Sequence, residues 1–182
     1  MDLGIQGKTA LVCGSSQGLG RAIAHALAME GVHLVINSRS ADKLANVQAE
    51  ILEATGATVT SIAADLTDPE GVNSLVAQTE EAFGKIDILV TNTGGPAAGP
   101  FESHTPEVWR HAIAQNFESV VNLVRAVLPG MKESKWGRIV NVTSISVKQP
   151  VDGLILSNAI RAGVTGFAKT ISNEVAPFNV TV

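Results

Sequence analysis

Tyrosine is absent from this sequence of 182 residues, cysteine occurs once, as Cys13, and histidine occurs four times. Without tyrosine, no phenol is present to act as an acid, a base or a radical. A single thiol excludes an internal disulfide and a zinc or iron–sulfur centre held by several thiolates. The histidines show neither HxH nor HExxH spacing, so we predict no metal site.

Basic residues are fewer than acidic ones, and the formal net charge is −4. This balance argues against nucleic-acid binding through a broad basic surface. No run of about 18 apolar residues is free of charge, so we expect no membrane span. The start, MDLGIQGKTALV, lacks the apolar core of a secretory signal. With one cysteine and no targeting segment, the sequence favours a cytoplasmic protein.

The length and a hydrophobic content of 45% predict one compact domain spanning residues 1–182. Short apolar runs alternate with longer segments of helical periodicity. Strands are expected over Lys8–Cys13, His33–Asn37, Thr58–Ala63, Ile86–Thr91, Gly137–Val142 and Val180–Val182. Helices are expected over Gly18–Glu30, Ser40–Thr55, Asp68–Phe83, Thr105–Met131 (with a bend near Pro129) and Leu154–Val175. Strands that are apolar throughout and separated by helices indicate a doubly wound parallel α/β sheet.

The segment Gly14–Gly20 (GSSQGLG) joins the first expected strand to the first expected helix. Glycine lets the backbone turn tightly and approach a pyrophosphate without a Cβ in the way. The helix N-terminus behind it offers unpaired N–H groups and a positive dipole end. The loop therefore predicts a dinucleotide phosphate site. The alternative is a tight strand-to-helix turn that binds nothing.

The residues that follow the second strand indicate which cofactor is bound. An acidic residue there binds the ribose hydroxyls of NAD, whereas an arginine accommodates a 2′-phosphate. This chain has Asn37, Ser38 and Arg39, so we predict NADP, with NAD less favoured. Arg39 could otherwise be a solvated side chain at a helix start. Asp65, after the third strand, could accept from the adenine amino group, or could be a turn residue or helix cap.

In this order the motifs resemble those of the short-chain dehydrogenase/reductase family, and along the whole chain they are similar to bacterial 3-oxoacyl-carrier-protein reductases. Segment Cys13–Gly20 matches the family motif TGxxxGxG with cysteine for threonine, and Thr91–Gly94 matches NNAG with its second Asn and its Gly. Asn116 matches the asparagine of the family's fifth helix, and Ser144 matches the catalytic serine. The resemblance implies a Rossmann-type fold, a small-molecule carbonyl substrate, and a homodimer or homotetramer. It also implies a cofactor held by Gly14, Ser16, Gly18, Leu19, Gly20, Ser38, Arg39, Asp65, Leu66, Asn92 and Gly94.

The sequence departs from the family at the YxxxK motif. Thirteen residues after Ser144 stands Ser157, and four further on stands Arg161, so the motif reads SNAIR. The two residues lie i, i+4 on one helical face. However, a serine hydroxyl is a far weaker acid than a phenol of pKa about 10, and arginine stays protonated. The resemblance implies that Ser144 orients the carbonyl, Arg161 holds the ribose and Asn116 supports a water relay, with Ser157 in the place of the acid.

Two functions remain open. The first is an NADP-dependent oxidoreductase for a carbonyl or secondary alcohol. Loss of its general acid would cost roughly 10²–10⁴-fold in rate, and the proton could come from Ser157 with water, Lys148 or Asp152, unless these two charged residues are simply solvated. The second is a non-catalytic NADP-binding protein with a regulatory or structural role. His104, in a loop before a helix, could approach a substrate or be structural. Family members are usually longer, so the resemblance implies a domain cut off in its sixth strand.

Overall fold

The sheet at the centre of the molecule has six parallel strands in the order β3-β2-β1-β4-β5-β6. The computed structural model describes residues 2–182; Met1, where the expected domain begins, lies outside the described residues. This strand order confirms the doubly wound, Rossmann-type α/β fold expected from the sequence. The strands are β1 (Thr9–Val12), β2 (His33–Ser38), β3 (Val59–Ala63), β4 (Ile88–Thr91), β5 (Gly137–Asn141) and β6 (Val180–Thr181).

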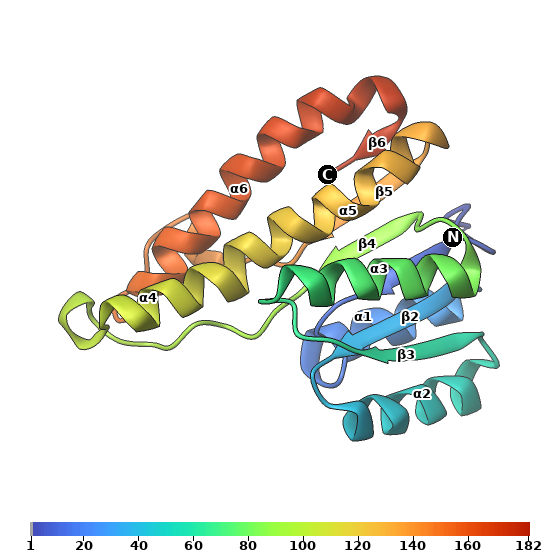
Figure 1. Ribbon diagram of the computed structural model, residues 1–182, viewed down its shortest axis with the longest axis horizontal. Coiled ribbons are helices and arrows are strands. Elements are labelled where there is room, and N and C mark those ends of the chain that lie inside the picture. The colour runs from blue at the N-terminus through green and yellow to red at the C-terminus, as the bar shows by residue number, and fades with distance from the viewer. Residues whose placement is uncertain (1) are drawn as a thin grey trace.

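Helices cover both faces of the sheet (Figure 1). Side chains alternate across a strand, so Val12 and Ile36 pack into one apolar cluster with α1 and α2. Leu11 and Val35 belong to the opposite cluster with α3, α5 and α6. Each fully buried side chain of this size contributes about 1.5–3 kcal/mol. The helices are α1 (Gly18–Met29), α2 (Ala41–Thr55), α3 (Pro69–Phe83), α4 (Pro106–Ile113), α5 (Ser119–Glu133) and α6 (Ile155–Val175).

Residues chosen from the sequence as helix ends act as such. The Ser40 hydroxyl accepts from the Lys43 N–H at 3.4 Å and begins α2, and Gly56 ends it with φ of 66°. Asp68 accepts from the Glu70 N–H and begins α3. Such caps satisfy N–H and C=O groups that have no partner inside the helix. The two caps at helix starts, Ser40 and Asp68, fix where the loops that follow β2 and β3 end.

The long helix expected over Thr105–Met131 is interrupted, and the interruption lies away from Pro129, near which a bend was expected. A π-helical segment, Ala114–Glu118, separates α4 from α5, whereas Pro129 lies inside the uninterrupted α5. An inserted π turn rotates the side chains around it, and here Asn116 is turned fully into the interior. Its carboxamide forms three hydrogen bonds there, which gives the interruption a physical reason.

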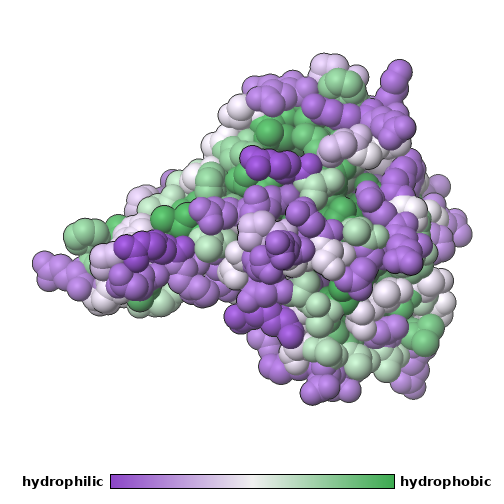
Figure 2. All heavy atoms as spheres, viewed as in Figure 1, coloured by the Kyte–Doolittle hydropathy of each residue, from purple (hydrophilic) through white to green (hydrophobic). Residues whose placement is uncertain are grey.

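The segment from Asn92 to α4 extends away from the sheet and makes the molecule elongated (Figure 1). In the same view, hydrophilic side chains cover most of the surface, while apolar residues reach it along α5 and α6 (Figure 2). None of the helices within residues 2–182 is long and apolar enough to cross a membrane. Within the same residues, no three His, Cys, Asp or Glu side chains are grouped as metal ligands would be.

Candidate functional site

A cleft of about 440 Å³ opens at the carboxyl ends of β1, β2, β3 and β4. Ligands bind at this edge in open α/β sheets, where the strand order reverses. The structure brings to this cleft every residue that the sequence analysis assigned to the cofactor except Gly20 and Arg161, which was expected to hold the ribose. That they bind a cofactor stays a prediction. The lining residues among them are Gly14, Ser16, Gly18, Leu19, Ser38, Arg39, Asp65, Leu66, Asn92 and Gly94.

The three glycines of the loop after β1 serve different purposes. A Cβ on Gly14 would lie 2.6 Å from the Asn92 carbonyl oxygen, and one on Gly20 would collide with the Gly14 carbonyl. These two glycines therefore let the loop pack against Asn92, whose Nδ2 donates to the Gly14 carbonyl at 3.1 Å. Gly18 has a φ of +58° with open space beside it. It leaves room in the cleft for a phosphate.

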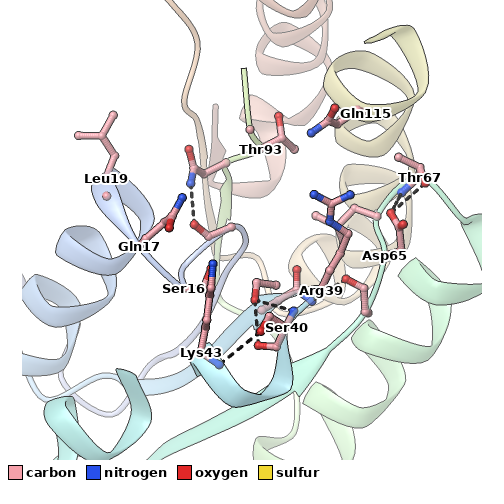
Figure 3. Close-up of a pocket in the computed structure, with 18 residues that line it drawn as sticks. Ser16, Gln17, Leu19, Arg39, Ser40, Lys43, Asp65, Thr67, Thr93 and Gln115 are labelled. Carbon is pink, nitrogen blue, oxygen red and sulfur yellow. Dashed lines mark hydrogen bonds between the residues drawn. The ribbon is translucent and has the colours of Figure 1, made fainter. Parts of the chain in front are cut away.

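Two cations enter the cleft beyond β2. In Figure 3 the Lys43 side chain rises from α2 toward Ser16, and the Arg39 guanidinium lies toward Asp65 and Thr67. Neither cation forms an ion pair with a carboxylate of residues 2–182. Sequence reasoning missed Lys43, although its place four residues after Arg39 was a usable signal. A pair of free cations beside serine hydroxyls suits a phosphate monoester.

Asp65 forms a turn at the same edge. Its carboxylate accepts from the backbone N–H of Thr67 at 2.9 Å and from the Thr67 hydroxyl at 2.8 Å. The Thr67 N–H, more than any other group, lowers the pKa of Asp65, and the charge of Arg39 adds to the effect. The turn-residue interpretation of Asp65 therefore describes its geometry. A bond to the adenine amino group stays a prediction.

Three serines come together where the reaction was expected. The Ser144 hydroxyl accepts from the Ser146 N–H at 3.1 Å. The buried hydroxyls of Ser146 and Ser157 are 3.3 Å apart. Ser146 therefore connects the two serines singled out in the sequence. It was missed because nothing in its spacing from the family motifs distinguishes it.

Arg161 and Asn116 are both buried and hydrogen-bonded to each other. Arg161 donates from Nη2 to Asn116 Oδ1 at 3.0 Å and from Nη1 to the Val142 carbonyl at 2.6 Å. Asn116 Oδ1 also accepts from the Thr93 hydroxyl at 3.1 Å. Burial lowers the pKa of Arg161, because a charged group loses solvation. Thr93 lines the cleft, so this network reaches the cofactor edge.

The surroundings of the remaining candidates fit the non-catalytic interpretation of each. Lys148 and Asp152 are exposed loop residues, in line with solvated charges. His104 is half-buried and packs beside Gly99, where a Cβ would lie 3.0 Å from its ring. Cys13 is fully buried, and burial raises the pKa of its thiol to about 12. A thiol in that state is inert.

A model of the short chain dehydrogenase family matches residues 8–182. The chain belongs to the short-chain dehydrogenase family. Among curated relatives, this chain is 36% identical over 178 residues to the D-beta-hydroxybutyrate dehydrogenase of Rhizobium meliloti. The match covers 96% of this chain and 68% of that protein. It is 35% identical over 178 residues to the 3-oxoacyl-(acyl-carrier-protein) reductase of Haemophilus influenzae, covering 98% and 72%.

The solved structures show the same fold. The crystal structure of L-sorbose reductase from Gluconobacter frateurii, complexed with NADPH and L-sorbose, matches with a TM-score of 0.95. The two chains are 35% identical, and the match covers 99% of this chain and 68% of the sorbose reductase. The family resemblance drawn from the glycine loop, Asn116 and Ser144 is thereby confirmed.

Proposed function

We propose that this short-chain dehydrogenase is an NADP-dependent oxidoreductase that interconverts a carbonyl and a secondary alcohol, in the manner of a 3-oxoacyl reductase. One observation carries the cofactor choice: Arg39 and Lys43 enter the cleft after β2, where an NAD enzyme has an acid. Family membership and relatives named as reductases and dehydrogenases support the reaction. Residues 1–182 act in this proposal as one dinucleotide-binding domain.

The cleft fits a dinucleotide. The open side of Gly18 and the N-terminus of α1 would hold the pyrophosphate, and Arg39, Lys43 and Ser38 the 2′-phosphate. Asp65 would take the adenine, and Asn92 and Gly94 the nicotinamide ribose. When bound, the cofactor supplies the hydride that adds to the carbonyl carbon. The protein must then place the carbonyl and provide one proton for its oxygen.

Serines provide that proton in this proposal. The Ser144 hydroxyl donates to the carbonyl oxygen and fixes its position, and Ser157 passes its proton to the same oxygen and regains one from water. The hydroxyls of Ser146 and Ser157 are 3.3 Å apart and either can donate; in this proposal Ser146 is the donor, which leaves the Ser157 O–H free to point at the substrate. Arg161 adds a fixed positive charge. A serine is a weak acid, so we expect turnover roughly 10²–10⁴-fold below that of an enzyme with a tyrosine.

A non-catalytic NADP-binding protein is the second candidate. It is favoured by the chain's lack of tyrosine and by the buried bonds that hold Arg161 to Asn116 and Val142. A guanidinium fixed in this way is less free to act on a ribose. In this version the cleft binds the nucleotide, and the regulatory or structural role depends on the bound state.

Two measurements separate the candidates. Calorimetric titration with NADPH tests binding, and loss of NADPH absorbance tests turnover on 3-oxoacyl thioesters, 3-oxo acids and ketoses. For an enzyme, we expect turnover that falls at least tenfold in Ser144→Ala, because the carbonyl loses its donor. Binding with no turnover above that control supports the non-catalytic protein. Failure to bind NADPH contradicts both.

The assembly and location are further parts of the proposal. We expect a homodimer or homotetramer, because apolar residues reach the surface along α5 and α6 (Figure 2). A cytoplasmic location is also part of the proposal, supported by the low cysteine content. Light scattering coupled to size exclusion measures the oligomer, and a monomer at micromolar concentration contradicts it.

A further inference from the structure

Arg161 is a buried cation that has no counter-ion within the described part of the chain. The residue is 6% exposed, and it forms no ion pair with any carboxylate of residues 2–182. Burying an unpaired charge is costly unless its N–H groups find good acceptors. Both identified partners are neutral oxygens, the Val142 carbonyl and Asn116 Oδ1. The guanidinium is therefore held by hydrogen bonds alone.

Those bonds join four separate parts of the chain. Arg161 comes from α6, Val142 follows β5, Asn116 lies in the π-helical segment and Thr93 follows β4. Asn116 is the junction, since its Oδ1 accepts from Arg161 and from the Thr93 hydroxyl, and its Nδ2 donates to the Ala112 carbonyl at 3.2 Å. The orientation of its carboxamide is thus fixed from three sides.

The arginine fork explains why this junction is possible. A guanidinium presents several N–H donors in one plane and can bind two acceptors in different directions at once. A lysine ammonium is a compact charge at the end of a flexible chain, and it cannot reproduce this planar bridge. Arg161 is therefore matched to Asn116 and Val142 as a pair, and replacing it with lysine would release at least one of them.

We propose that Arg161 is a positioning residue for the nicotinamide end of the cleft, acting on Thr93 through Asn116. Thr93 and Gly94 line that end, and Gln115 reaches it from the π-helical segment (Figure 3). The bond network holds this wall in place before any ligand arrives, which reduces the ordering that binding requires. The proposal rests on the proposed cofactor for its ligand but not for the network itself.

Binding of two nucleotides tests the role. In the proposed site NADPH spans the whole cleft, whereas 2′,5′-ADP lacks the nicotinamide mononucleotide half and occupies the other end only. We expect Arg161→Met and Thr93→Val each to weaken NADPH about tenfold and to leave 2′,5′-ADP unchanged. The double variant should lose no more than the larger single loss, because both changes break one network. Arg161→Lys should also bind NADPH more weakly than the unaltered protein.

Other outcomes of these binding measurements would contradict the positioning role of Arg161. If Arg161 holds the ribose by direct contact, Arg161→Lys keeps full affinity and the two losses add in the double variant. Unchanged NADPH affinity, or an equal loss for 2′,5′-ADP, also overturns the proposal.

Hydrogen exchange of the unliganded protein gives a readout independent of the cofactor. In Arg161→Met and in Arg161→Lys we expect faster hydrogen exchange in residues 92–94 and 114–118. Exchange in the loops that follow β1 and β2 should not change. Unchanged exchange in both overturns the positioning role. If exchange rises but NADPH does not bind even to the unaltered protein, the proposed function fails and the network stands.

Discussion

At the scale of single residues, the charge around the cleft is uneven. The chain is acidic overall, with a net charge of −4, yet Arg39 and Lys43 enter the cleft from neighbouring positions and remain unpaired within residues 2–182. Cations left free in an acidic protein are available to a ligand. In the proposed function, these two side chains carry the preference for NADP over NAD.

Removing either cation tests that choice. We expect Arg39→Gln and Lys43→Gln each to weaken NADPH about tenfold, since a hydrogen bond to a charged group is worth about 1.5–3 kcal/mol and these sites are partly solvated. NADH affinity should not change. Arg21→Gln is the matched control, because Arg21 is paired with Glu50 outside the cleft. Calorimetric titration measures all three, and parallel losses for NADH and NADPH would show that the cations do not read the phosphate.

Asp65 gives a prediction about pH. Hydrogen bonds from Thr67 lower its pKa in the folded protein below the ordinary value of 3.8. A lowered folded pKa stabilises the fold above the unfolded pKa, and this stabilisation is lost as pH falls through the folded pKa. Asp65→Asn should therefore unfold more easily at pH 7, with a difference that shrinks as the solution is acidified below about pH 4. Urea unfolding at several pH values measures it, and a difference that grows toward acid contradicts the sign.

At the scale of elements, the two faces of β5 are covered unequally. Val140 is 50% exposed, whereas Val90, its register partner in β4 on the same face, is 2% exposed. Val90 packs in the cluster under α1 and α2. A parallel strand is ordinarily covered on both faces, so within residues 2–182 this part of the sheet is open on one side.

The register pair makes a matched test of burial. Val→Thr keeps the shape of the side chain and adds a hydroxyl that burial leaves without water. We expect Val90→Thr to lower the free energy of unfolding by about 1–3 kcal/mol and Val140→Thr by a few tenths at most. Chemical denaturation measures both. Equal losses would mean that Val140 is covered in solution, for instance by a second copy of the chain.

The elements also show where sequence reasoning succeeds. Apolar runs and the caps at Ser40 and Asp68 are local signals, so the strands and most helices were predictable. The break at Asn116 was not, because its cause is long-range. Asn116 bonds to Thr93 and Arg161, 23 and 45 residues away along the chain. The apolar periodicity of a helix reports only on residues a few positions apart, so it cannot predict such distant partners.

At the scale of the whole molecule, the family motifs predicted which residues line the cleft. They did not predict the contacts around Ser157 and Arg161. The loops that follow parallel strands meet at one edge of the sheet whatever their side chains are. Gly14, Arg39 and Asn92 were therefore expected to lie together at that edge. Ser146 was missed because its contact with Ser157 depends on how α6 packs against the loop after β5, whereas Lys43 was missed although its spacing from Arg39 was a usable signal. The orientation of Arg161 toward Asn116 and Val142 likewise follows from packing between α6 and the π-helical segment.

Cys13 offers a probe of the molecule as a whole. It is fully buried, directly before the glycine loop, and its thiol has a pKa of about 12. The thiolate is the reactive form, so a thiol reagent at pH 8 should modify Cys13 only when the fold opens. In denaturant, where the pKa returns toward its ordinary value, modification should be immediate. As the only cysteine, Cys13 reports this opening without interference.

Ligand binding should slow that modification. Anything that binds the folded state alone reduces the open population by the factor 1 + [L]/Kd, so NADPH at about 100 times its Kd should slow labelling by about 100-fold if global opening is the route. Mass spectrometry measures the rate, and the Arg39→Gln variant, which binds NADPH more weakly, should be protected less at the same concentration. Rapid labelling of the native protein would contradict the burial of Cys13. Protection by NADH equal to that by NADPH at matched concentrations would contradict the phosphate site, because the cleft would then bind both nucleotides with the same affinity.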